Sequence, residues 1–259
     1  MGTRLGIEER GEVLVWTLDR PETKNALDAQ AMIELGEAID AAGKSDARAA
    51  VLTGANGVFV SGGDLRELRE RGTPEDAARL TDMGFHLCHA LGELPFPVIA
   101  ALSGPAIGGG AELALACDLR VASPAARIGF KQARMGVTTA WGSAGRLVSL
   151  VGPSTAMRLL VTASEIGAEE ARQIGLVDAV ADDAIAVAVA WADEVAKNAP
   201  RSVASLKRLV RDAATLAGVR ERERETFIGA WTGPDRREAV EAWFERRAPR
   251  FLAREKTGG

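Results

Sequence analysis

One segment of this 259-residue chain, residues 94–117, restricts the fold more than any other, because Glu112 is its only charged residue. Three prolines and four glycines interrupt the apolar segment, so it does not read as a membrane-spanning helix. The order of residue types predicts a buried strand at 97–102, a glycine-rich turn, and a helix that begins at Gly108-Gly109-Gly110. The chain therefore has to bury a strand, a turn and a helix start around a single carboxylate.

Strand and helix patterns alternate over most of the chain. Short apolar runs at 13–18, 49–53 and 58–60 predict further strands. Helical spacing of apolar residues follows Asp28 and Thr73, and both residue types cap helix starts. Alternating strands and helices indicate an α/β fold with a mostly parallel sheet.

The pattern changes after about residue 183, where only helical periodicity remains and charges are frequent. We expect helices at 184–198, 200–227 and 236–251. We divide the chain into a core domain at residues 1–195 and a helical region at residues 196–259. Aromatic residues in this second region predict that it packs on the core or on a partner subunit.

Composition excludes several classes of function. The formal net charge is −4 and basic residues are mixed with acidic ones, which argues against a nucleic-acid-binding protein. The chain has no tyrosine, so no step can use a phenolic acid. Its start carries early charges and no apolar signal region. Cys88 and Cys117 lie in apolar stretches and are expected to be reduced core residues, which suits a cytoplasmic protein without membrane attachment.

The only two histidines, His86 and His89, are three residues apart on a predicted helix and so share one face. Two ligands without a third nearby make a poor metal site. We interpret them as surface or rim histidines, with polar groups of a pocket as the alternative, and expect no metal.

Glu112 admits two interpretations. Burial among apolar residues disfavours the carboxylate anion, so the pKa of Glu112 should rise toward neutral pH, which suits a group that transfers protons. Alternatively, the carboxylate accepts hydrogen bonds from backbone N–H groups at a helix start. The residues by themselves favour neither.

The glycines before Glu112 have a chemical use of their own. Backbone N–H groups at a helix start carry partial positive charge and, without side chains, can closely approach a carbonyl oxygen. Two such groups would stabilise an enolate oxyanion, at about 3 kcal/mol for each donor. A dinucleotide site is the rival interpretation, but Leu113 stands where its third glycine is required.

Several motifs together resemble the crotonase superfamily, also called the enoyl-CoA hydratase/isomerase family. They are KNAL at 24–27, VLTG at 51–54, FVSGGDL at 59–65, PVIAALSGPAIGGGAELALACD at 97–118, GRL at 145–147, GAEEARQIGLV at 167–177 and FERRAPRF at 244–251. The resemblance implies a spiral of ββα units and a C-terminal helical trimerisation region. It also implies an acyl-CoA substrate, no separate cofactor, and a homotrimer or a dimer of trimers.

The resemblance also implies roles for particular residues. The N–H groups of Gly63 and Gly109 would form the oxyanion hole beside the catalytic Glu112. Arg66 would contact a CoA phosphate, unless it is merely a solvated surface charge, and the same alternative holds for Lys24. The remaining residues expected around CoA are Ala26, Ser61, Asp64 and Leu65.

The chain departs from the family's hydratases at one position. Their second catalytic glutamate corresponds to Gln132, which cannot carry a proton and so either binds the substrate or is structural. The segments 72–76, 135–142 and 229–234 look most like ethylmalonyl-CoA decarboxylase-type members, with Trp141 as an apolar wall of the site or as simple core filling. We therefore expect decarboxylase- or isomerase-like chemistry through a thioester enolate. The alternatives are an enoyl-CoA hydratase and a non-catalytic acyl-CoA-binding protein.

Overall fold

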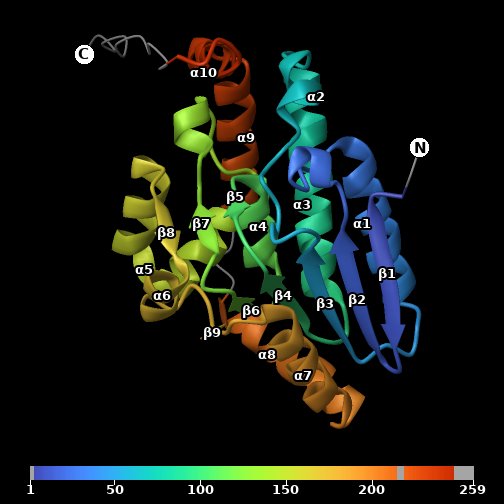
Figure 1. The fold of residues 1–259 in the computed structure, drawn as a ribbon. Coiled ribbons are helices and arrows are strands. Elements are labelled where there is room, and N and C mark those ends of the chain that lie inside the picture. The colour runs from blue at the N-terminus through green and yellow to red at the C-terminus, as the bar shows by residue number, and fades with distance from the viewer. Residues whose placement is uncertain (1–2, 215–218, 248–259) are drawn as a thin grey trace.

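The computed structural model describes residues 3–214 and 219–247. A six-stranded sheet in the order β1-β2-β3-β4-β6-β9 lies beside a three-stranded sheet in the order β5-β7-β8 (Figure 1). The strands of the larger sheet are β1 (Leu5–Arg10), β2 (Val13–Leu18), β3 (Ala49–Gly54), β4 (Val98–Leu102), β6 (Leu119–Ala122) and β9 (Ala179–Val180). Those of the smaller sheet are β5 (Ala106–Ile107), β7 (Arg127–Gly129) and β8 (Glu165–Gly167).

From β2 to β9 every neighbouring pair in the larger sheet is parallel, and only β1 pairs antiparallel, with β2. All residues of β3 and β4 are buried. Strands buried on both faces need helices on both sides. The predicted α/β fold with a mostly parallel sheet is therefore confirmed.

Helices cover the two faces of the larger sheet. On one face α1 (Ala29–Ala42) and α3 (Pro74–Glu93) share a core with Trp16, Leu52 and Ala100. On the other face α7 (Ala184–Ala196) packs on β2, β3, β4 and β6. Successive strand residues point to opposite faces, which divides the core in this way. The remaining helical elements of the core are η1 (Pro21–Thr23), α2 (Leu65–Arg69), α4 (Gly109–Ala116), η2 (Gln132–Met135), α5 (Ser143–Thr162) and α6 (Ala168–Gln173).

Two helix starts form as their sequence predicts. The Asp28 carboxylate accepts a hydrogen bond from the Ala31 N–H at the start of α1. At the start of α3, Thr73 and Asp76 exchange hydrogen bonds in a capping box. Bonds from Thr73 lower the pKa of the Asp76 carboxyl group, because they favour its charged form.

The C-terminal helices differ in extent from the prediction. Residues 200–227 were expected to form one helix; the structure has α8 (Pro200–Ala214) and α9 (Val219–Trp231), and residues 215–218 between them lie outside the described part. The last helix, α10 (Pro234–Phe244), begins earlier and ends before residue 251, and residues 248–251 lie outside the described part. Helical spacing reports a period but not where a helix begins or ends, so the predicted end at residue 227 and the predicted bounds of the last helix were wrong.

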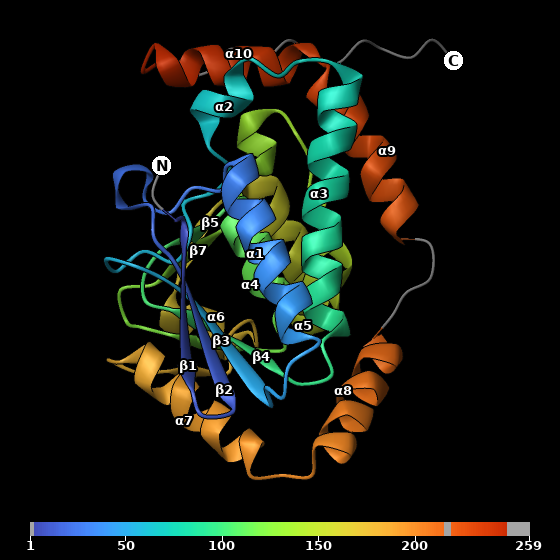
Figure 2. The same cartoon turned by 90° about the vertical axis from the view of Figure 1, so that its right-hand side faces the viewer.

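The C-terminal helices surround the core on two sides (Figure 2). α8 lies at the same end of the molecule as α7, while α9 packs along α3 and α10 packs on η2. Lys207 fastens α8 to the core through Asp118 at 2.8 Å and through two backbone carbonyls. No helix in the described part is long and apolar enough to cross a membrane.

Candidate functional site

Two glycine-bearing loops lie side by side beyond the carboxyl ends of β3 and β4. Val60 bridges Ala106 in a parallel arrangement, and the Ile107 N–H donates to the Val60 carbonyl over 2.9 Å. Further along, the Gly62 Cα lies 3.9 Å from the position of a Cβ on Gly108. The contacts between these two loops thus bring Gly63 and Gly109, which are far apart in sequence, to the same edge of the sheet. Ligands of parallel α/β sheets bind at this edge.

The geometry of the second loop requires glycine at two positions. Gly108, which precedes α4, has a φ of 56°, a conformation that side chains disfavour. A Cβ on Gly110 would lie 2.3 Å from the Val60 carbonyl oxygen, so a side chain would push the two loops apart. The glycine run therefore allows the close approach of the loops as well as the start of α4.

The N–H groups of Gly63 and Gly109 donate no hydrogen bond to any other described residue. Gly109 is the first residue of α4, where N–H groups have no partner within the helix. Gly63 lies in an isolated bridge whose two bonds are made by the Gly62 carbonyl and the Asp64 N–H. Neither amide is used up by regular secondary structure, which the proposed oxyanion hole requires.

A polar network holds the loop before α1 against the loop that carries Gly63. Ser61 donates through its side chain to the Thr23 carbonyl at 3.0 Å and through its backbone to the Lys24 carbonyl. Arg20 pairs with Asp64 at 3.0 Å and with Asp28 at 3.2 Å. Asp64 therefore orders the loop next to Gly63.

The other residues expected around CoA surround these two loops. Ala26 is buried and its carbonyl accepts a hydrogen bond from Arg20, whereas the Leu65 side chain at the start of α2 is half-buried. Lys24 and Arg66 are exposed. Both cations are accessible to a phosphate, but exposure is equally what a solvated surface charge would show.

The Glu112 carboxylate is buried, with 4% of the residue exposed, and accepts at least four hydrogen bonds. One oxygen accepts from the Ser143 hydroxyl at 2.6 Å and from the backbone N–H groups of Trp141 and Ala140 at 3.1 and 3.3 Å. The other accepts from the Gln132 amide at 2.6 Å. Four donors around one carboxylate stabilise its anion and oppose the effect of burial.

These contacts combine the two interpretations of Glu112. The carboxylate does accept backbone N–H groups, but they belong to the loop before α5 and not to the start of its own helix. It also accepts a hydrogen bond from Gln132, the residue expected from the motifs at the hydratases' second glutamate, so the two predicted residues meet in space. The site therefore joins one carboxylate to one amide.

Trp141 packs between the start of α4 and α3. A Cβ on Gly109 would lie 2.8 Å from the indole, and a Cβ on Gly84 would lie 2.0 Å from it. The indole therefore occupies space next to Gly109 that a smaller residue would leave open. Trp141 is thus a buried residue that also lies directly beside Gly109.

Ser143 and Gly84 are parts of this site that the sequence did not reveal. Ser143 is the first residue of α5 and follows Gly142, a pairing typical of helix starts. That signal predicts a cap, yet the hydroxyl donates to Glu112 instead. Gly84 lies inside a long helix, where glycine is unfavourable unless a neighbour needs the space.

The structure agrees with the interpretations of the cysteines and histidines. Cys88 and Cys117 are free and buried, and burial raises the pKa of the Cys117 thiol to about 12. His86 and His89 are both exposed. Among the described residues no three histidine, cysteine or acidic side chains are grouped as metal ligands.

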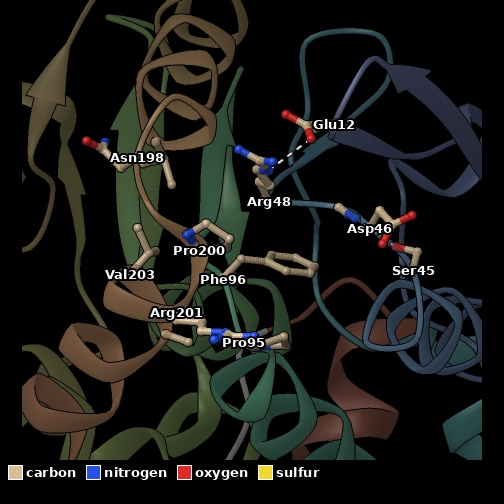
Figure 3. Close-up of a pocket in the computed structure, with 13 residues that line it drawn as sticks. Glu12, Ser45, Asp46, Arg48, Pro95, Phe96, Asn198, Pro200, Arg201 and Val203 are labelled. Atoms are coloured by element: carbon tan, nitrogen blue, oxygen red, sulfur yellow. Dashed lines mark hydrogen bonds and ion pairs between the residues drawn. The ribbon is translucent and has the colours of Figure 1, made fainter.

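A groove of about 460 Å³ lies at the opposite edge of the sheet, between the amino ends of β2 to β4 and α8 (Figure 3). Phe96 and Pro200 line it, and a 2.9 Å ion pair between Arg48 and Glu12 borders it. None of the residues predicted for the site line this groove. The groove separates α8 from the strands and is distinct from the site around Glu112.

Comparison with known proteins identifies the chain. The model of the enoyl-CoA hydratase/isomerase family matches residues 8–254. The chain belongs to the enoyl-CoA hydratase/isomerase family. The enzyme family and the crotonase fold expected from the motifs are therefore confirmed.

Individual relatives of this family member carry different activities in their names. It is 38% identical to a probable enoyl-CoA hydratase, echA6, of Mycobacterium tuberculosis over 95% of this chain and 98% of that one. It is 30% identical to the ethylmalonyl-CoA decarboxylase of Bos taurus over 90% and 79%. An enoyl-CoA hydratase/isomerase structure from Mycobacterium paratuberculosis superposes with a TM-score of 0.87, at 26% identity, over 93% and 98%.

Proposed function

We propose that this family member acts on an acyl-CoA thioester and holds the enolate oxygen between the N–H groups of Gly63 and Gly109. Glu112 is then the one group that moves a proton to or from the substrate. The observation that carries the proposal is the buried Glu112 carboxylate beside two glycine amides that bond to no other described residue. CoA itself lies along the loops of Lys24, Ser61 and Arg66, and no separate cofactor takes part.

Within this chemistry, double-bond isomerisation fits the state of Glu112 best. We infer that the resting group is an anion, because the backbone N–H groups of Ala140 and Trp141 and two side-chain donors point at it, and an anion begins by accepting a proton. Glu112 takes a proton from C2 of a 3-enoyl thioester, and the electron pair of that bond moves into a dienolate whose charge rests on the thioester oxygen. Glu112 then returns the proton to C4, so substrate and product have the same atoms and the enzyme is regenerated. Decarboxylation would instead require Glu112 to begin as the acid.

Hydration is the second candidate, and Gln132 is the observation that favours it. Its Oε1 is buried and has no partner, while its amide nitrogen bonds to Glu112. That oxygen can accept a hydrogen bond from a water that Glu112 deprotonates. The activity in the name of the mycobacterial relative agrees with this candidate.

Parallel incubation with a 3-enoyl-CoA, crotonyl-CoA and ethylmalonyl-CoA separates the reactions. Migration of the double bond with little hydration and no CO₂ supports isomerisation. Fast hydration of crotonyl-CoA supports the second candidate, and CO₂ release from ethylmalonyl-CoA supports decarboxylation; either would overturn the preferred reaction. Tight CoA binding without turnover of any of them would identify a non-catalytic acyl-CoA-binding protein.

We further propose that the protein is a homotrimer or a dimer of trimers. The support is apolar surface: Leu206, Leu209 and Val210 on α8 are exposed, as are Met157 and Val161 on α5. Exposed apolar surface of this kind typically marks an interface. Light scattering on the purified protein measures the number of subunits, and a monomer at micromolar concentration would contradict this proposal.

A further inference from the structure

Arg236 is a buried cation that no step of the proposed chemistry uses. Only 5% of the residue is exposed, although it lies near the start of α10. Its guanidinium stacks on the Trp231 ring at 4.2 Å and donates one hydrogen bond to the Leu68 carbonyl. Burial lowers the pKa of the Arg236 guanidinium, and the charge of Asp76 only partly opposes this effect.

The guanidinium lacks the partner that a buried charge normally has. None of the carboxylates in residues 3–214 and 219–247 whose side chains are described forms an ion pair with it. Buried charges are ordinarily paired, because removing them from water is costly. One carbonyl bond leaves most of the five N–H donors of an arginine without an acceptor.

A second orphan donor lies beside the first. The indole Nε1 of Trp231 is buried and has no hydrogen-bond partner, and only 4% of the residue is exposed. A buried indole N–H usually finds an acceptor. Two adjacent donors, one of them charged, together require an acceptor with negative charge.

The position of Arg236 connects it to the candidate site. The carbonyl that it binds belongs to Leu68, whose side chain lies 2.8 Å from the position of a Cβ on Gly63. Its helix, α10, packs on η2, which carries Gln132. Figure 2 shows α10 crossing the end of the molecule next to α2 and the start of α3. Leu68 therefore contacts both places, with its side chain beside Gly63 and its carbonyl at Arg236.

We propose that Arg236 and the Trp231 N–H bind a terminal carboxylate on the acyl chain, so that the substrates are CoA thioesters of dicarboxylic acids. A carboxylate matches the planar fork of an arginine and can accept the indole N–H as well. Because Leu68 has its side chain beside Gly63 and its carbonyl at Arg236, we place the carboxylate several carbons from the thioester and not on the α-carbon. The inference rests on the proposed acyl-CoA site, whose oxyanion glycines fix the other end of the chain.

Binding of saturated acyl-CoA pairs tests the inference independently of the reaction. Calorimetry compares glutaryl- and adipyl-CoA with pentanoyl- and hexanoyl-CoA, which match them in chain length but lack the terminal charge. We expect the protein to bind the dicarboxylic member of a pair about 10- to 100-fold more tightly. Equal binding of both members, or a preference for the uncharged ones, would overturn the inference.

Single variants test whether Arg236 causes the tighter binding of dicarboxylic acyl-CoA thioesters. Arg236→Met should abolish it while leaving the affinity for CoA alone unchanged, and Trp231→Phe should reduce it by a smaller factor. Arg237→Met is the matched control, because Arg237 is exposed on the same helix and its loss changes the net charge equally. Should Arg236→Met weaken binding of CoA alone, the bound anion is a CoA phosphate and the inference is wrong.

These measurements separate this inference from the proposed function. Glu112→Gln should bind adipyl-CoA with the wild-type preference, because it keeps the acyl site and removes only the proton-transferring group. If the protein turns over no thioester but binds dicarboxylic ones more tightly, the proposed reaction is refuted and the inference about Arg236 stands. If Arg236→Met fails to fold, the Trp231→Phe variant still decides, since an unchanged preference in that variant contradicts a shared carboxylate site.

Discussion

The Glu112 carboxylate supports the loop before α5 as well as the proposed chemistry, and replacing it in two ways should separate these roles. Glu112→Ala leaves four donors facing a hole. The Ser143 hydroxyl and the Gln132 amide can rotate toward other partners, but the backbone N–H groups of Ala140 and Trp141 cannot. An orphaned buried donor costs about 1–3 kcal/mol, so we expect the free energy of unfolding to fall by about 2–6 kcal/mol.

Glu112→Gln should behave differently because it keeps the shape of the group. Its amide oxygen can still accept from Ser143 and Trp141, and its nitrogen can donate to Gln132 once that side chain turns its free Oε1 inward. The amide also carries no charge whose burial would be costly. We expect stability within about 1 kcal/mol of the wild type, and a fall in kcat of about 10²- to 10⁴-fold if Glu112 carries the proton.

Urea unfolding followed by tryptophan fluorescence, together with kcat on the substrate that the incubations identify, measures both effects. Wild-type stability in Glu112→Ala would show that the donors do not depend on this carboxylate. Wild-type turnover in Glu112→Gln would show that the proton is carried by another group. Either result refutes part of the reasoning, and the two variants refute different parts.

Three further predictions concern packing and caps. Thr73→Ala should lower the free energy of unfolding by about 1 kcal/mol and return the pKa of Asp76 toward its usual range, with Thr73→Ser as the control; an unchanged pKa by NMR titration would contradict this. Gly84→Ala should destabilise the protein by about 1–3 kcal/mol by pressing on the Trp141 indole, and Trp141→Leu in the same chain should restore much of the loss; an additive double variant would exclude that contact. The Cys117 thiol, whose pKa burial raises to about 12, should resist iodoacetamide at pH 8 until urea unfolds the chain, and rapid native labelling would disprove its burial.

The sequence determined the parts of this protein that depend on neighbours along the chain. The caps at Asp28 and Thr73 form within one helical turn of the residues that they bond to, so residue order alone predicts them. The single charge at Glu112 and the glycines before it were likewise apparent as a pattern. The length of the last helices was not, because periodicity does not encode where a chain turns.

Only the tertiary structure decided what surrounds these residues. Glu112 bonds to Ser143, 31 residues away, and the space beside Gly84 is taken by Trp141 from another part of the chain. Arg236 reaches Leu68 across 168 residues. A hydrogen bond or a packing contact depends on distances of a few ångströms, and the path of the intervening backbone sets those distances. Residue types therefore indicated the chemistry of the site, whereas the fold determined which residues lie close enough to bond to its charged groups.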